Sequence, residues 1–288
     1  RAFLKVQDGC DYKCSFCTIP LARGKSRSNT ISNVIDNVHK IASENIKEIV
    51  LTGINLGDFG ANSNETIQYN FFDLVKELDK LDLSVRFRIS SIEPNLLSDE
   101  IIEFISTSKK FVNHFHIPLQ SGSNSVLKLM RRRYDSELYK SRIKRINRLM
   151  PDACIGVDVI VGFPGEDDDK FLESMSFIED LDISYLHVFK YSERNNTHAV
   201  TLPNIVNPNI RSKRSKLLRL LSSRKKAAFY NKNIGTIHEV LFESEDKNGF
   251  IEGFSSNYVR FRRKWDSSLT GCLVESKFTE IDSEGFAT

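Results

Sequence analysis

The stretch Cys10-Asp11-Tyr12-Lys13-Cys14-Ser15-Phe16-Cys17 places three thiols within eight residues, directly after the strand-like run Phe3–Gln7. Such a cluster predicts a metal site. Three cysteines can bind three irons of a cubane cluster and leave the fourth iron open to an external ligand, whereas a structural zinc ion takes four protein ligands. The spacing therefore favours a 4Fe–4S cluster over zinc.

The composition is typical of a globular protein, with 40% hydrophobic and 27% charged residues among 288. No apolar run approaches the roughly 20 residues that span a bilayer. Five cysteines are an odd number, which suits a reducing compartment and a metal better than a disulfide framework. We therefore expect a cytoplasmic protein without a membrane partner. Because the chain enters a strand almost at once after Arg1 and has no initial methionine, we also expect a missing upstream segment.

Strand-like and helix-like segments alternate six times, which predicts repeated β-α units and a parallel sheet. The expected strands lie near residues 3–7, 46–52, 85–90, 114–117, 153–161 and 184–191, and the helices near 32–43, 71–81, 98–108, 136–150, 167–181 and 210–231. In the third strand, Phe87 and Ile89 share one face, whereas Arg86 and Arg88 share the other. A closed eight-stranded barrel has an apolar centre. The polar face therefore predicts an α/β fold with an open six-unit (β/α) partial TIM-type barrel, residues 1–233.

After Asn233 the pattern changes to short alternating runs separated by glycine or charged turns. These runs lie near residues 236–242, 249–254, 257–261 and 272–278, with a fifth at the terminus. Five short strands predict a small all-β, OB-like barrel of the kind that binds oligonucleotides. We expect it to form a second domain, residues 234–288.

The net charge of the chain is only +3, but its basic residues are concentrated in particular segments. Residues 124–150 hold nine lysines or arginines against two acidic residues, and residues 209–233 hold nine and no acidic residue. One basic helix is usually a solvated face, but two of them beside the basic and aromatic run Tyr258–Trp265 indicate a polyphosphate partner such as RNA. The predicted RNA-contact residues are Arg131, Arg132, Arg133, Lys225, Lys226, Tyr258, Arg260, Arg262 and Arg263.

Polar and glycine-containing segments follow the carboxyl ends of strands two to five. Parallel barrels place their chemistry at that end, where the cysteine loop also lies. Each segment alone reads as a turn, but their convergence predicts a ligand pocket. The predicted cofactor-binding residues are Phe16, Gly53, Asn55, Ser91, Glu93, Gln120, Ser121, Gly162 and Pro164. We expect the isolated Cys154 and Cys272 to be core residues, and His114 and His116 to be interior histidines rather than catalysts.

Six segments of this pattern resemble the radical S-adenosylmethionine (SAM) methylthiotransferases: Gly9–Gly24, Leu51–Gly53, Ser90–Pro94, Pro118–Ser123, Met130–Tyr134 and Asp158–Glu166. The resemblance covers essentially the whole chain, and residues 234–288 are similar to the RNA-binding TRAM domain. It implies a 4Fe–4S cluster held by Cys10, Cys14 and Cys17, with SAM bound at the open iron. It also implies a second 4Fe–4S cluster in an upstream domain.

Within that family, Gln7–Cys10, Ala22–Ser28 and Arg131–Tyr134 are most similar to the branch that acts on tRNA threonylcarbamoyladenosine. The resemblance implies a methylthio group added to carbon 2 of that base, the tRNA anticodon stem-loop as partner, and an electron donor such as flavodoxin or ferredoxin. It implies no catalytic side chain beyond the cluster and SAM. The alternatives are a sister enzyme acting on isopentenyladenosine or on a ribosomal-protein aspartate, and a non-catalytic RNA-binding module with a structural metal.

Overall fold

The computed structural model describes residues 1–61, 69–246 and 249–288. Six parallel strands form two three-stranded sheets, with the orders β1-β4-β5 and β6-β7-β8. The strands are β1 (Ala2–Lys5), β4 (Glu48–Thr52), β5 (Arg86–Ile89), β6 (His114–His116), β7 (Cys154–Val161) and β8 (Tyr185–Lys190). A parallel bridge between Phe87 and Phe111 links the two sheets. Six parallel strands in chain order confirm the predicted α/β fold.

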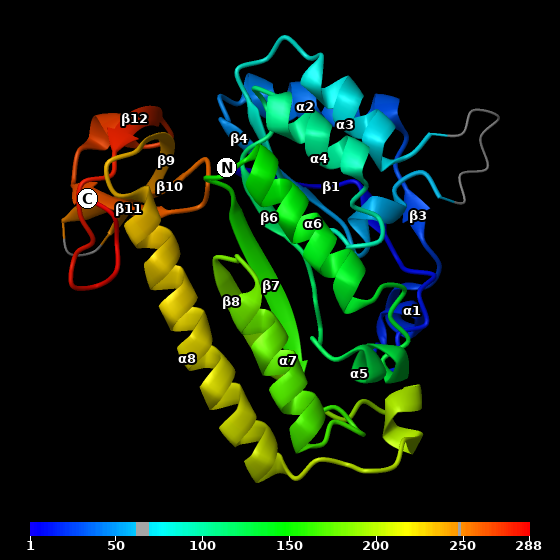
Figure 1. The fold of residues 1–288 in the computed structure, drawn as a ribbon. Helices are drawn as coiled ribbons and strands as arrows, with labels where there is room; N and C mark the ends of the chain where they lie inside the picture. The colour runs from blue at the N-terminus through cyan, green and yellow to red at the C-terminus, as the bar shows by residue number, and fades with distance from the viewer. Residues whose placement is uncertain (62–68, 247–248) are drawn as a thin grey trace.

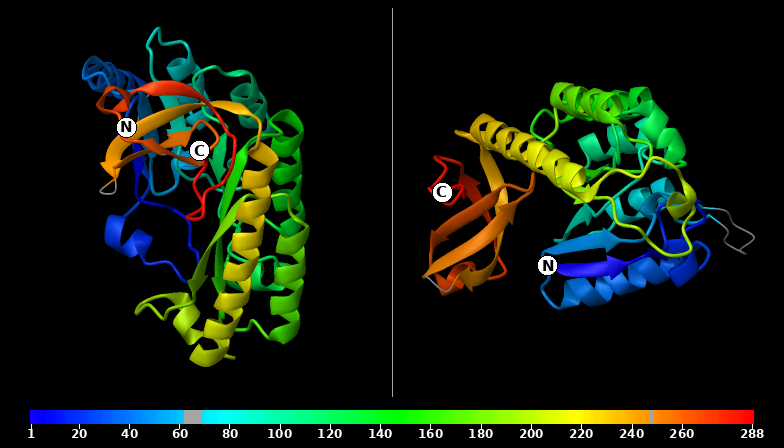
Figure 2. Two further views of the ribbon diagram at one scale, coloured as in Figure 1. Left: turned by 90° about the vertical axis from the view of Figure 1, so that its left-hand side faces the viewer. Right: turned by 90° about the horizontal axis from the view of Figure 1, so that it is seen from below.

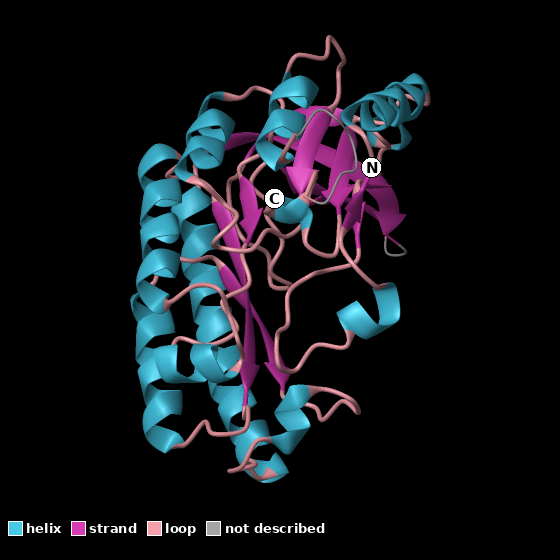
Figure 3. Ribbon diagram, turned by 90° about the vertical axis from the view of Figure 1, so that its right-hand side faces the viewer, coloured by secondary structure: helices cyan, strands magenta, loops and turns pink. Residues whose placement is uncertain are grey.

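Helices cover the outer face of these strands (Figure 1, Figure 3). They are α2 (Ile31–Ser43), α3 (Phe71–Asp79), α4 (Asp99–Thr107), α6 (Ser136–Leu149) and α7 (Asp168–Asp180). Outward residues of the strands, such as Phe87, Phe115 and Val157, form one buried core with the apolar faces of the helices. The side chains of Thr30 and Asn70 cap α2 and α3 by accepting backbone N–H groups.

The inner face of the strands is polar, as the alternation of residues predicted. The carboxylate of Glu48, which has no exposed surface, accepts hydrogen bonds from Nε of Arg86 (2.6 Å), Arg88 (3.0 Å) and Arg1 (2.7 Å). Among the described residues, β1 and β8 do not pair with each other, so the barrel is open between them.

Helix α8 (Pro208–Asn233) packs along β8 and α7 and leads to a separate antiparallel sheet (Figure 1, Figure 2). That sheet has the order β11-β10-β9-β12. Its strands are β9 (Ile237–Asp246), β10 (Phe250–Ser255), β11 (Arg260–Lys264) and β12 (Leu273–Lys277). Phe242, Phe261 and Phe278 are fully buried in a second core, which also includes Phe229 and Tyr230 of α8 and Cys154 of β7. Of the expected fifth strand, the described residues show two single bridges at Ala287.

The antiparallel sheet meets the barrel at the amino ends of the parallel strands. The guanidinium of Arg86 donates to the carbonyls of Glu239 and Phe254 (both 3.1 Å), and that of Arg88 donates to the carbonyl of Ser255 (3.3 Å). The Tyr258 ring lies 4.3 Å from the imidazole of His114, centroid to centroid. The buried charges of the barrel thus also hold the antiparallel sheet.

Several smaller elements differ from expectation. The strand expected at 257–261 begins at Arg260, because Tyr258 has a φ of 65° and interrupts the extended chain. Cys154 is buried as predicted, but the prediction that Cys272 is a core residue was wrong, since it is only partly buried in the turn before β12. Two short strands, β2 (Gln7–Asp8) and β3 (Arg27–Ser28), and two short helices, α1 (Ile19–Arg23) and α5 (Asn124–Leu129), were not predicted. No helix of the described residues has the length and apolar character needed to cross a membrane.

Candidate active site

The cysteine loop, residues 9–17, leaves the barrel at a sharply defined turn. Gly9 has a φ of 70°, and a Cβ at this position would lie 2.0 Å from the carbonyl oxygen of Lys25, so that only glycine fits. The buried amide of Gln7 donates to the carbonyl of Gly9 (2.8 Å) and to the hydroxyl of Ser26 (3.0 Å). These contacts determine the direction in which the loop presents its thiols.

Each of the three sulfurs accepts a hydrogen bond. Backbone N–H groups two residues further along donate to the sulfurs of Cys10 and Cys17 (both 3.4 Å), and Nη1 of Arg132 donates to the sulfur of Cys14 (3.0 Å). Such N–H···S bonds stabilise negative charge on sulfur and tune the potential of a bound iron–sulfur cluster.

The chemistry of the three thiols fits a metal cluster. Burial raises the pKa of Cys10 to about 11 and also raises the pKa of Cys14, so the thiolates need the positive charge of a bound metal centre. Three thiols match three irons of a cubane cluster, whereas a structural zinc ion takes four protein ligands.

Arg132 joins the cysteine loop to the strand ends. Besides Cys14, its guanidinium pairs with the carboxylate of Glu93 and contacts the hydroxyl of Tyr134 (Nε–O 3.1 Å). The Tyr134 hydroxyl donates in turn to the carbonyl of Pro118 (2.8 Å). The side chain of Arg132 is only 4% exposed. Arg132 was predicted to contact RNA. Nothing in the basic run Arg131–Arg133 indicated that its side chain would lie beside Cys14.

Five of the predicted cofactor-binding residues lie near the cysteine loop. The N–H of Asn55 donates to Oε1 of Gln7 (2.9 Å), and a Cβ at Gly53 would lie 3.0 Å from the same oxygen. Phe16 packs edge-on against Phe163, with ring centroids 6.2 Å apart. Glu93 reaches the loop through Arg132, and the partly buried Ser91 precedes it by two residues.

The remaining four lie at the carboxyl ends of β6 and β7. Gln120 has a φ of 66°, donates its N–H to a β7 carbonyl (2.8 Å) and is partly exposed. Ser121 and Pro164 are buried, and Ser121 accepts a backbone N–H through its hydroxyl. A Cβ at Gly162 would lie 2.2 Å from Cγ of Arg211. Cofactor contact by these residues stays a prediction.

The predicted RNA-contact residues differ in their exposure and in the groups that they contact. Arg131 and Arg133 are exposed between α5 and α6, and the Arg133 guanidinium lies 3.9 Å from the Tyr12 ring centroid. Lys225 donates to two carbonyls at the end of α7, and Tyr258 stacks on Phe254. Arg262 is buried and pairs with Glu284, whereas Lys226, Arg260 and Arg263 lie over the rings of Tyr230, Phe286 and Phe242. Arg131, Arg133 and Lys226 are therefore the exposed members of this set.

The sequence model of the radical SAM superfamily matches residues 4–178, more than half of the chain. The chain belongs to the radical SAM superfamily. This membership confirms the predicted cofactors, a 4Fe–4S cluster and SAM. That Cys10, Cys14 and Cys17 hold the cluster stays a prediction.

Curated relatives of this radical SAM chain include tRNA-modifying enzymes. The chain is 40% identical to the threonylcarbamoyladenosine tRNA methylthiotransferase MtaB of Bacillus subtilis (strain 168), over 96% of this chain and 62% of the relative. It is 37% identical to MtaB of Aquifex aeolicus, over 92% and 62%, and 33% identical to the tRNA-2-methylthio-N(6)-dimethylallyladenosine synthase of Bacillus subtilis, over 97% and 55%. The chain thus spans about 62% of the length of the MtaB relatives.

Solved radical SAM structures share the fold at low sequence identity. The methyltransferase TsrM from Kitasatospora setae matches with a TM-score of 0.54 at 16% identity, over 66% of this chain and 34% of that protein. Methylornithine synthase (PylB) matches with a TM-score of 0.52 at 13% identity, over 78% and 62%. At such identities the likeness concerns the fold alone.

Proposed function

We propose that this radical SAM chain is part of a tRNA methylthiotransferase that modifies carbon 2 of threonylcarbamoyladenosine. The observation that carries the proposal is the cysteine loop on the rim of a six-stranded barrel, within a chain 40% identical to MtaB over 96% of its length. Identity to two MtaB proteins, 40% and 37%, exceeds the 33% identity to dimethylallyladenosine synthases, which favours the threonylcarbamoyl substrate.

The residues around the rim would have different roles in such an enzyme. Cys10, Cys14 and Cys17 would hold the cluster, which together with SAM supplies one-electron activation of a C–H bond. Arg132 keeps Cys14 in place and supplies a positive charge beside it. The paired rings of Phe16 and Phe163 form an apolar wall that excludes water from this side of the site.

The remaining parts of the chain fit the recognition of tRNA. We propose that residues 234–288 are a TRAM-like RNA-binding domain, because they form a small antiparallel sheet over a second hydrophobic core, distinct from the main core of the barrel. The exposed Arg131 and Arg133 would contact phosphates of the anticodon stem-loop. The cluster that donates sulfur would lie in the part of the relatives that this chain does not span, and a flavodoxin or ferredoxin would supply electrons.

Anaerobic reconstitution of the chain tests the radical SAM step. We expect four irons and four sulfides per chain, and conversion of SAM to 5′-deoxyadenosine and methionine after addition of dithionite, measured by liquid chromatography and mass spectrometry. Cys14→Ala should abolish both, whereas the matched control Cys272→Ala, outside the cluster loop, should retain both. A colourless protein that leaves SAM intact would support the structural-metal alternative instead.

Nucleoside mass spectrometry tests the substrate. A bacterial strain that lacks its own methylthiotransferases is complemented with a full-length gene that contains the coding sequence of this chain and of the upstream cluster domain, and its tRNA is digested to nucleosides. The 2-methylthio derivative of threonylcarbamoyladenosine should reappear. If the derivative of isopentenyladenosine or a methylthio-aspartate in a ribosomal protein appears instead, the substrate assignment is wrong.

A further inference from the structure

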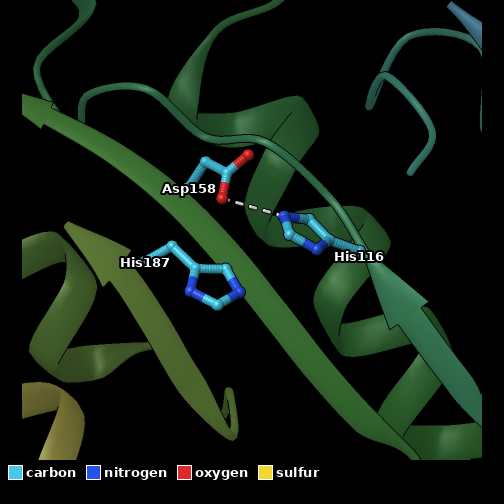
Figure 4. A group of neighbouring side chains, drawn as sticks. All are labelled: His116, Asp158 and His187. Carbon is cyan, nitrogen blue, oxygen red and sulfur yellow. Dashed lines mark ion pairs between the residues drawn. The ribbon is translucent and has the colours of Figure 1, made fainter. Parts of the chain in front are cut away.

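Three polar side chains from adjacent strands meet on the inner face of the barrel (Figure 4). His116 of β6, Asp158 of β7 and His187 of β8 have polar atoms within 4.8 Å of one another. Nε2 of His116 lies 2.9 Å from Oδ1 of Asp158, and the two imidazoles stack with centroids 5.4 Å apart. Asp158 and His187 are direct partners in the β7–β8 register. We name these three residues the inner-wall triad.

The inner-wall triad is accessible and has unused hydrogen-bonding capacity. His187 is exposed, and the side chains of His116 and Asp158 retain 18% and 24% of their surface. Nε2 of His116 is buried yet has no hydrogen bond of good geometry within the described part of the chain. On the opposite face of the same strands, Phe115 and Val157 are completely buried under the helices. The triad therefore faces the interior of the open barrel and can receive a polar ligand.

The surrounding charges favour an anionic ligand. On the inner face of the neighbouring strands, the guanidiniums of Arg1, Arg86 and Arg88 lie against the carboxylate of Glu48, and Arg1 also pairs with Glu243, which leaves one positive charge in excess. Burial, followed by the charge of Arg88, lowers the pKa of His114 in the same strand as His116. In a partly desolvated barrel such a field attracts a carboxylate.

We infer that the inner-wall triad binds the threonylcarbamoyl substituent on N6 of the target adenosine, an inference that rests on the proposed function. In adenine, carbon 2 and carbon 6 flank N1, so the N6 substituent lies on the same edge of the base as the reacting carbon. When that edge faces the cofactor on the rim, the substituent lies along the inner wall. Its carboxylate can accept from the imidazoles of His116 and His187, and its hydroxyl and N–H groups can donate to Asp158.

The same arrangement discriminates against an N6-dimethylallyl group, which is a hydrocarbon. That group would remove water from the inner-wall triad without replacing its hydrogen bonds. Sites built to form hydrogen bonds reject analogues that lack the polar group much more strongly than apolar pockets distinguish one hydrocarbon from another. The triad thus selects the substrate branch.

Binding measurements on the reconstituted chain test this inference. Three anticodon stem-loop RNAs of one sequence carry threonylcarbamoyladenosine, dimethylallyladenosine or adenosine, and fluorescence anisotropy gives each Kd in the presence of SAM. Wild type should prefer the first RNA. His187→Leu should weaken that binding about ten- to hundredfold, since it removes a hydrogen bond to a charged group, and leave the other two within about twofold. His187→Gln should restore part of the affinity, and the exposed His39→Leu of α2 serves as the control.

Several results would contradict this inference. Equal binding of the three RNAs by wild type, or an equal loss on all three in His187→Leu, would overturn the inference. Because two histidines and an aspartate are also a metal-ligand set, mass spectrometry must show whether one divalent ion per chain is present in wild type and absent in His187→Leu; its presence would overturn direct recognition. If the tRNA of the complemented strain contains no methylthio nucleoside, the proposed function is wrong. If the product forms normally but His187→Leu has the same RNA selectivity as wild type, only the inference about the inner-wall triad is wrong.

Discussion

Replacement of Glu48 by glutamine should destabilise the fold by about 3 kcal/mol at pH 7. Burial alone would raise the pKa of Glu48, but the charges of Arg88 and Arg86 outweigh it and hold the pKa at about 2, against an ordinary value of 4.5. At about 1.4 kcal/mol for each pKa unit, this difference corresponds to about 3 kcal/mol. Removing one partner of a buried ion pair costs about 3–5 kcal/mol, which agrees.

The sign of the pH dependence follows from the lowered pKa. The ionised carboxylate stabilises the fold fully above pH 4.5, and this contribution is lost as the pH falls toward 2. Wild type should therefore lose its advantage over Glu48→Gln across that range. Guanidinium unfolding followed by circular dichroism, repeated from pH 7 to pH 3, measures the difference.

The exposed ion pair of Glu77 and Lys80 supplies the control. Glu77→Gln should change the free energy of unfolding by less than about 0.5 kcal/mol, because exposed pairs contribute little. If Glu48→Gln unfolds within 1 kcal/mol of wild type at pH 7, or if the difference between the two proteins does not shrink in acid, the inner-wall charges do not hold the fold as argued.

Three further predictions concern the rim. Joint replacement of Arg131 and Arg133 by alanine should reduce the slope of log K against log salt for tRNA binding by about 1 to 2, measured by anisotropy. Arg132→Ala should leave that slope unchanged but lower the reduction potential of the bound cluster, because it removes an N–H···S bond and a positive charge; a redox titration followed by electron paramagnetic resonance measures this. Gly9→Ala should lower the iron content and destabilise the chain by more than about 1 kcal/mol, since its Cβ would overlap the Lys25 carbonyl.

Two of these predictions have a matched control. Lys109→Ala, at an exposed position after α4, should not alter the salt slope, and an equal effect from it would remove the arginines from the RNA footprint. Gly285 also has a positive φ, of 82°, but an added Cβ there would meet nothing within 4 Å, so Gly285→Ala should leave the iron content unchanged. A potential unaffected by Arg132→Ala would show that its contact with Cys14 is electrostatically unimportant.

Periodicity in the sequence was enough to predict the parallel fold. Helices and strands each have a characteristic spacing of apolar residues, which can be recognised within a single segment of the sequence. The alternation of Arg86 and Arg88 with apolar neighbours likewise predicted the polar inner face. The cysteine spacing predicts the cluster loop for a similar reason, since the three candidate ligands are close in sequence. The two unpredicted helices are short, and α1 has no buried residue and hence no apolar face to recognise.

Contacts between distant segments could not be predicted. His116, Asp158 and His187 come together only because β6, β7 and β8 are neighbours in one register. Likewise, nothing within the run Arg131–Arg133 distinguishes the buried guanidinium from the exposed ones. That distinction depends on Cys14, which lies more than a hundred residues earlier in the chain.

Helix α8 is continuous and connects the carboxyl end of the barrel strands to the antiparallel sheet. Near its start, Arg211 and Arg214 are anchored beside the carboxyl end of β7, and near its end Asn233 bonds to Asn257 beside the antiparallel sheet. An uninterrupted helix of 26 residues spans about 39 Å. One continuous helix therefore sets the separation between the cysteine-bearing rim of the barrel and the antiparallel sheet. Under the proposed function, an RNA bound at both ends would have to match this fixed distance.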